Sequence, residues 1–110
     1  MEVSEKIFQD QVIKIAKMQQ WLVFHASVSS PRPGVYKTDG KGFPDLVLTS
    51  TAIPSRGVIF AELKRNDGKL SDEQKEYAQH LINAGIEYHI WRPSDIDKIA
   101  ARLGRQPRTV

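Results

Sequence analysis

The 110-residue sequence contains no cysteine, and this absence excludes both a disulfide framework and a thiolate metal site. It also lacks an apolar run of the roughly 20 residues that cross a bilayer, so we expect no membrane anchor. Charged residues interrupt the N-terminal segment, which is unlike a signal peptide and predicts an intracellular protein. Any bound metal must therefore use oxygen or imidazole ligands, and carboxylates favour Mg²⁺ or Mn²⁺.

The composition is that of one small folded domain. Hydrophobic residues make up 40% of the chain and charged residues 26%, which suits a single modest core. The net charge of +3 is compatible with a polyanionic partner such as nucleic acid, although many basic domains bind none. We predict one domain over residues 1–104, followed by a loose basic tail over residues 105–110.

Residue periodicity predicts an α/β domain with the order helix, three strands, helix, strand, helix. A capping-box pattern at Ser71 and Gln74 marks the start of the second helix, and Ser94 is expected to cap the last one. The expected elements are a helix at 4–18, strands at 21–28, 45–49, 58–64 and 88–91, and helices at 72–84 and 95–103. The second and third strands should form a hairpin within a central mixed sheet flanked by helices.

A long loop is predicted from Ser29 to Phe43, where Ser, Pro and Gly occur without periodicity. Loops of this length in small domains are often functional. Its basic residues Arg32, Lys37 and Lys41 therefore suggest a mobile flap that faces the substrate.

Two acids and a lysine fall at or near the ends of the predicted hairpin strands. Alternation along the second hairpin strand places Glu62 and Lys64 on one face, and Asp45 begins the first. A hard cation would satisfy both carboxylates, together with the backbone carbonyl of Leu63, and would activate water against a phosphodiester. Lys64 would orient that water or offset phosphate charge. Alternatively, these residues simply face solvent, because Glu-x-Lys alone is too short to decide.

The sequence around these acids resembles a known nuclease family. Gly42-Phe43-Pro44-Asp45-Leu46 followed by Ala61-Glu62-Leu63-Lys64 is similar to the PD-(D/E)XK signature, and specifically to the virus-type replication-repair nuclease (VRR-NUC) family in its stand-alone phage or bacterial type. The resemblance implies a restriction-endonuclease-like core. It extends over nearly the whole chain, through Glu5 and Gln9, Leu70-Ser71-x-x-Gln74 and Trp91-Arg92-Pro93-Ser94-Asp95.

The resemblance also implies roles for individual residues. Asp45 and Glu62 would bind the metal, Leu63 would contribute its carbonyl oxygen, and Lys64 would be the catalytic lysine. Glu5 would complete the acidic cluster, although an acid in the first turn also suits the helix dipole. Gln74 would be a further catalytic residue, although the capping box explains the same glutamine.

Other residues carry weaker expectations. Gln9 lies one turn after Glu5 and either supports that acid or is solvated. His25 is interpreted as structural rather than as a phosphate contact, and neither His80 nor His89 has metal-ligand spacing. Both tryptophans, Trp21 and Trp91, are expected in the core. Four arginines would contact a phosphate backbone or be solvated, namely Arg92, Arg102, Arg105 and Arg108.

The expected reaction is metal-dependent hydrolysis of DNA by an endonuclease. The sequence has no groove-reading helix or zinc-finger spacing, which favours recognition of backbone charge and DNA shape. The resemblance implies branched DNA such as a Holliday junction, in replication, recombination or repair within a bacterium or phage-infected cell. A homodimer would supply a second active site. Two alternatives stay open: a less selective nuclease for flaps, ends or single strands, and a non-enzymatic nucleic-acid-binding module.

Overall fold

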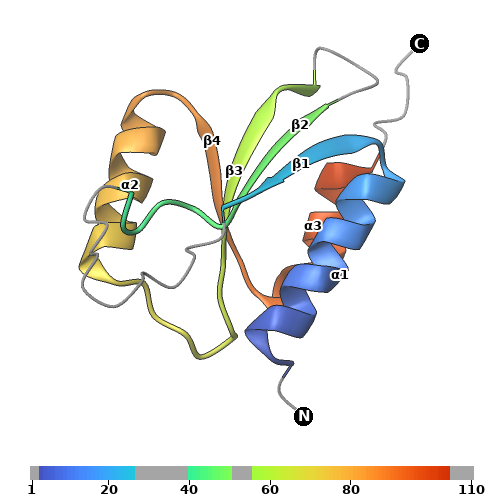
Figure 1. Cartoon of the computed structure of the whole chain (residues 1–110), viewed down its shortest axis with the longest axis horizontal. Helices are drawn as coiled ribbons and strands as arrows, with labels where there is room; N and C mark the ends of the chain where they lie inside the picture. The colour runs from blue at the N-terminus through green and yellow to red at the C-terminus, as the bar shows by residue number, and fades with distance from the viewer. Residues whose placement is uncertain (1–2, 27–39, 51–55, 105–110) are drawn as a thin grey trace, which may run out of the picture.

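The computed structural model describes residues 3–26, 40–50 and 56–104, which form one mixed sheet between helices (Figure 1). The elements are α1 (Glu5–Met18), β1 (Trp21–His25), β2 (Leu46–Ser50), β3 (Val58–Leu63), α2 (Asp72–Asn83), β4 (Glu87–Trp91), the 3-10 helix η2 (Pro93–Asp95) and α3 (Ile96–Leu103). This arrangement confirms the predicted α/β class and the predicted order of helices and strands.

The four strands lie in the order β1-β2-β3-β4. β2 is antiparallel to both β1 and β3, so the predicted hairpin of β2 and β3 is confirmed. β4 is parallel to β3. The helix α2 connects these two strands and returns the chain to the end of the sheet at which β3 begins. Figure 1 shows α2 on one face of the sheet and α1 with α3 on the other.

The core lies between the sheet and the pair α1 and α3. The fully buried residues Phe8, Val12 and Ala16 recur at helical spacing and give α1 one apolar face. Opposite them lie the alternate, buried residues of the central strands, namely Leu46 and Leu48 on β2 and Ile59, Ala61 and Leu63 on β3. Burying each large side chain contributes about 1.5–3 kcal/mol, so this face fixes where α1 lies.

Both tryptophans belong to this core, as predicted. Trp21 is 3% exposed and Trp91 is 5% exposed. The indole Nε1 of Trp21 donates a 2.9 Å hydrogen bond to the carbonyl of Leu103, so the polar edge of the ring is also satisfied. The guanidinium of Arg102 lies 5.4 Å from the centre of the Trp21 ring and bonds Glu87 at 2.7 and 2.8 Å. Arg102 is thus paired within the fold.

Several element ends differ from the prediction. β1 ends at His25 rather than Val28, and Val28 itself is outside the described residues. β2 begins at Leu46, which leaves Asp45 just before the strand, and β3 ends at Leu63, which leaves Lys64 just after it. Strand boundaries depend on cross-strand hydrogen bonds, which a residue pattern does not specify.

The predicted cap at Ser94 is wrong. Residues Pro93–Asp95 form the 3-10 helix η2, and α3 follows without a side-chain cap. The carboxylate of Asp95 accepts a 3.0 Å hydrogen bond from the backbone N–H of Arg92, while the N–H of Ser94 donates to Asn66 at 3.1 Å. The stabilising side chain at this turn is therefore Asp95, which reaches back three residues.

The predicted flap is described only at its end. Arg32 and Lys37 lie outside the described residues, as do Arg105 and Arg108 of the predicted tail. Lys41 is described, and its Nζ lies 3.3 Å from a carboxylate oxygen of Glu73 at the start of α2. Within the described ranges, no helix is long and apolar enough to cross a membrane.

Candidate active site

Asp45 and Glu62 meet at the ends of β2 and β3. Leu46 pairs with Ala61, so the same antiparallel register places Asp45 opposite Glu62, on the face of the sheet that carries α2. The Oδ2 atom of Asp45 accepts a 2.8 Å hydrogen bond from the backbone N–H of Leu63. This bond holds the Asp45 carboxylate at the end of β3, beside Glu62.

Among the described residues, Glu62 is the only charged residue that is buried, with 2% of its surface exposed. Its Oε1 accepts a 3.0 Å hydrogen bond from Nε2 of Gln74, while its Oε2 has no partner among the described residues. Burial above all, followed by the closeness and negative charge of the Asp45 carboxylate, raises the pKa of Glu62 to about 9. The site thus holds a buried acid with one open oxygen beside a second acid.

Lys64 and Glu5 both act electrostatically on this acid. The nearby positive charge of Lys64 lowers the pKa of Glu62, and the negative charge of Glu5 raises this pKa by less than any of the other groups does. Lys64 directly follows β3, and its backbone N–H donates to the carbonyl of Trp91 at 3.0 Å. Glu5 is exposed in the first turn of α1.

Glu5 does not assemble with the other acids into a three-residue cluster. Across the described ranges, no three His, Cys, Asp or Glu side chains are grouped closely enough to hold a metal ion. The geometry therefore provides a two-carboxylate site of Asp45 and Glu62. A direct role of Glu5 at a metal stays a prediction.

Gln74 caps α2, as predicted, and its side chain also contacts Glu62, while its catalytic role stays a prediction. Its Oε1 accepts a 2.8 Å hydrogen bond from the backbone N–H of Ser71, and its own N–H donates to the Ser71 hydroxyl at 3.2 Å. These two bonds form the predicted capping box of α2. Because the cap uses only Oε1, the amide nitrogen is free to bind Glu62, and the two roles do not compete.

Replacing Gln74 should therefore have a different effect from replacing its capping partner. Ser71→Ala should lower the free energy of unfolding by about 1 kcal/mol and leave the rate of DNA cleavage close to wild type. Gln74→Ala should lose a similar stability and also reduce cleavage by roughly 10–100-fold, because the Glu62 carboxylate loses its anchor. Urea denaturation and initial cleavage rates would test this pair, and equal rates for both variants would contradict it.

Gly42 brings the Pro44-Asp45 segment against the first turn of α2. Its φ is +88°, and a Cβ atom there would lie 2.4 Å from the backbone carbon of Glu73. The next residue, Phe43, packs its ring edge-to-face against Tyr77 of α2. The sequence identified Gly42 only as part of a motif, because its contact with Glu73 joins segments about thirty residues apart.

Arg92 holds the turn that follows Lys64. Its guanidinium donates to the carbonyls of Arg65 and Gly68, at 2.6 and 2.7 Å. The structure thus shows Arg92 bound to the protein backbone, and its contact with a phosphate stays a prediction. Arg92 binds the backbone that follows Lys64 in the chain, and Asp45 binds the backbone of Leu63, which precedes Lys64.

The histidines and Gln9 take no part in these contacts. His25 pairs with Leu46 and therefore lies on the α1 face of the sheet, opposite to Asp45; it is exposed rather than part of the core. His89 contacts Glu87 at 2.8 Å and stacks on Trp91. Gln9 is half-buried on α1.

Tyr88 is a residue of this site that the sequence reasoning missed. It pairs with Phe60 and therefore shares the face of the sheet that carries Glu62. Its hydroxyl is buried and has no hydrogen-bond partner among the described residues. Burial, followed by the negative charges of Glu62 and Asp45, raises the pKa of Tyr88 to about 12. The alternation along β4 could have indicated Tyr88 from the sequence, because Tyr88 lies two residues from Ile90, the partner of Glu62.

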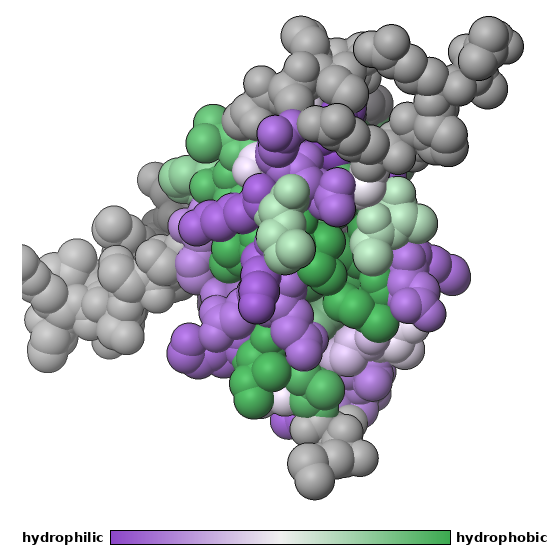
Figure 2. Space-filling view, turned by 90° about the vertical axis from the view of Figure 1, so that its right-hand side faces the viewer, coloured by the Kyte–Doolittle hydropathy of each residue, from purple (hydrophilic) through white to green (hydrophobic). Residues whose placement is uncertain are grey.

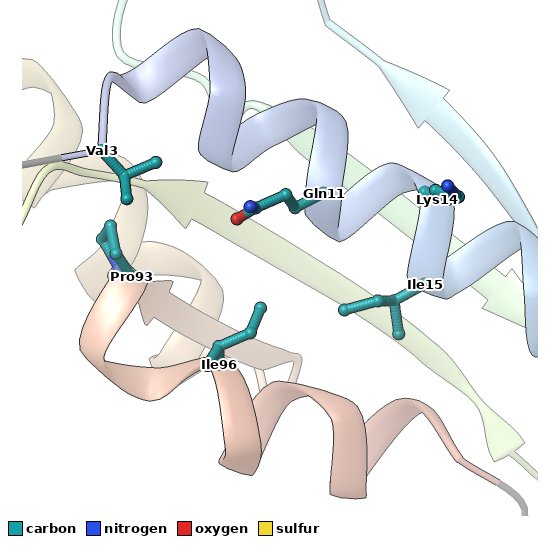
Figure 3. A pocket seen from close by; sticks show the side chains of 6 residues that line it. All are labelled: Val3, Gln11, Lys14, Ile15, Pro93 and Ile96. Carbon is teal, nitrogen blue, oxygen red and sulfur yellow. The ribbon is translucent and has the colours of Figure 1, made fainter.

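A hollow of about 450 Å³ lies elsewhere, between α1 and the segment of η2 and α3 (Figure 3). Its lining residues are Val3, Gln11, Lys14, Ile15, Pro93 and Ile96. The molecular surface on the side of α1 and α3 intersperses hydrophilic and hydrophobic residues (Figure 2). Because the hollow contains no carboxylate and none of the predicted site residues, we assign it no catalytic role.

The mixed sheet, with paired acids and a lysine at its strand ends, has the architecture of a nuclease-type α/β domain. The sequence profile of the VRR-NUC domain matches residues 11–94, and the chain belongs to this family. Family membership confirms the resemblance seen in the sequence. It gives the chain a nuclease-type function and points to DNA as the substrate class.

A solved structure described as a "VRR_NUC domain protein" shares the fold. It aligns with a TM-score of 0.62 over 94% of this chain and 93% of that chain, at 20% sequence identity. A search of curated proteins found no match.

Proposed function

We propose that this chain is a divalent-metal-dependent DNA endonuclease that hydrolyses phosphodiester bonds. The observation that carries the proposal is the open, buried Oε2 of Glu62 opposite the carboxylate of Asp45. A buried carboxylate oxygen without a partner is costly, and two adjacent acids cannot both ionise cheaply. A hard cation such as Mg²⁺ or Mn²⁺ would satisfy both carboxylates, which fits this all-oxygen donor set.

The backbone of Leu63 supports its assignment as a third ligand. The N–H of Leu63 is directed towards Asp45, and its carbonyl lies on the same side of the strand. The register of β2 and β3, carried two steps past Leu46, places Pro44 opposite Leu63. Proline has no N–H to donate, so the regular ladder offers this carbonyl no donor and leaves it for a cation.

The residues of the site divide the work of hydrolysis. A divalent cation held by Asp45 and Glu62 would supply Lewis acidity, which would polarise the phosphodiester and lower the pKa of the attacking water. Asp45 is held by the Leu63 N–H and Glu62 by Gln74, so both carboxylates are placed before substrate binds. The ammonium of Lys64 stabilises the negative charge that develops on the phosphate oxygens.

Cleavage assays with magnesium, manganese or chelator would test metal dependence. Asp45→Ala and Glu62→Ala should each lower the cleavage rate about 10³-fold or more, because the metal loses a carboxylate. Lys64→Ala should lower it about 10²–10³-fold. The matched controls are Asp97→Asn, an exposed acid on α3, and Lys69→Ala, an exposed lysine after the same turn. Cleavage that persists in chelator, or in the site variants, would overturn the proposal.

For the substrate we propose branched DNA such as a four-way junction, cut in replication, recombination or repair inside the cell. A small domain without a separate targeting module gains a larger footprint and a second active site as a homodimer. The edge strand β1 supports a dimer, because Leu22 and Phe24 are each 60% exposed on it. Light scattering that finds only monomer would reject that part of the proposal.

The same assays separate the alternatives when four-way junction, flap, linear and single-stranded DNA are compared. Preferential cutting of the junction supports the structure-specific function. Equal cutting of flaps, ends and single strands identifies a less selective nuclease. Binding of all substrates without cutting identifies a non-enzymatic module.

A further inference from the structure

Two polar atoms near the acidic pair are buried without a partner among the described residues. They are Oε2 of Glu62 and the hydroxyl of Tyr88, and the described ranges contain no other such side-chain atom. Buried polar groups in native proteins are almost always hydrogen-bonded, to protein or to ordered water. Two exceptions close together therefore indicate a shared partner.

The sheet geometry places the two atoms on the same side. Tyr88 pairs with Phe60 and Glu62 pairs with Ile90, so the two residues are diagonal neighbours on the face that carries α2. Diagonal residues on adjacent strands lie within reach of a long aromatic side chain. The Tyr88 hydroxyl is buried, and the negative charges of Glu62 and Asp45 contribute, after burial, to the raised pKa of this group.

We propose that Tyr88 is a positioning residue of the metal centre, whose hydroxyl donates a hydrogen bond through one ordered water to Oε2 of Glu62. A buried water needs two to four polar partners, and Tyr88, Glu62 and Asp45 supply three. Gln74 already fixes Oε1 of Glu62. Tyr88 fixes the other oxygen, so the carboxylate is oriented from both sides for a divalent cation. This inference rests on the proposed metal-dependent function.

Tyr88→Phe removes the hydroxyl and keeps the ring. Calorimetric titration with Mg²⁺ or Mn²⁺ alone should show an affinity roughly tenfold weaker than wild type, the usual cost of losing a partner of a metal ligand. Metal addition should also perturb the near-ultraviolet absorbance of tyrosine in the wild type, and this signal should vanish in Tyr88→Phe. Without metal, the variant should remain folded, because phenylalanine keeps the ring and its packing.

Tyr77→Phe is the matched control. Tyr77 lies on α2, and its ring packs edge-to-face against Phe43. This variant should bind metal as the wild type does and keep the absorbance signal.

The outcomes distinguish this inference from the proposed function. If the wild type binds metal and Tyr88→Phe binds it equally well, or if the absorbance signal persists in Tyr88→Phe, the positioning role is overturned and the metal-dependent function stands. A variant with unchanged metal affinity and a raised KM for DNA would place Tyr88 at the substrate instead, which also overturns the inference. A wild type that binds neither cation overturns both proposals.

Discussion

Glu62→Gln should abolish metal-dependent cleavage and, in the same protein, raise the free energy of unfolding without metal by about 1–3 kcal/mol at pH 7. The glutamine side chain can still accept from Gln74 through its carbonyl, and its amide can donate to Asp45. The substitution removes an acid whose ionisation is suppressed by burial in the folded protein. Folding at pH 7 then no longer requires this group to take up a proton, and the folded state is stabilised. Function is lost because a neutral amide is a poor ligand for a hard cation.

The pH dependence of this effect has a definite sign. The pKa of Glu62 is raised from 4.5 to about 9, so between these pH values the folded protein holds a proton that the unfolded chain has released. The contribution of Glu62 to stability therefore falls as pH rises through this range. Glu62→Gln carries no such proton, and its advantage over wild type should be small below pH 4.5 and widen up to about pH 9.

Urea denaturation in chelator across this pH range would measure the advantage. Glu76→Gln, which replaces an exposed acid on α2, is the control and should follow the wild type. Parallel curves for wild type and Glu62→Gln would contradict the prediction. Adding Mg²⁺ should stabilise the wild type but not Glu62→Gln, because only a native state that binds the ion gains from it.

Gly42→Ala should lower the free energy of unfolding by about 2–5 kcal/mol and reduce cleavage as well. A residue with a side chain pays about 1–2 kcal/mol at a φ of +88°. Its Cβ would also lie 2.4 Å from backbone of Glu73, so the start of α2 must move, at a further cost of about 1–3 kcal/mol. Because Gln74 is the next residue of α2, this movement should draw its amide away from Glu62.

Gly40→Ala separates strain from the close contact. Gly40 has a similar φ of +84°, but a Cβ atom there would meet nothing within 4 Å. It should therefore show only the backbone cost of about 1–2 kcal/mol and near-normal cleavage. Denaturation and cleavage rates of both variants would measure the difference. Equal losses in the two would show that the contact with α2 is unimportant.

Local patterns in the sequence specified most of the secondary structure. The apolar spacing of α1, the alternation of β3 and the capping box of α2 each act within a few residues, so they are visible in the chain itself. The motif around Asp45 and Glu62 also indicated the family, because its residues occur in a matching order of elements.

The sequence did not predict features that depend on competing local hydrogen bonds or on contacts between distant segments. The predicted cap at Ser94 is wrong because the Asp95 carboxylate accepts a hydrogen bond from the Arg92 N–H, which favours a 3-10 turn. The hydrogen bonds of Arg92 could not be predicted because its partners, the carbonyls of Arg65 and Gly68, lie on another segment.

The sequence by itself determined which elements form and indicated the family. Only the tertiary structure decided that Asp45 lies opposite Glu62, that Gln74 binds that acid in addition to capping α2, and that Tyr88 shares a face of the sheet with Glu62. The physical reason is distance along the chain. Propensities and caps act over three or four residues, whereas these contacts depend on strand register and on the packing of α2 against the sheet.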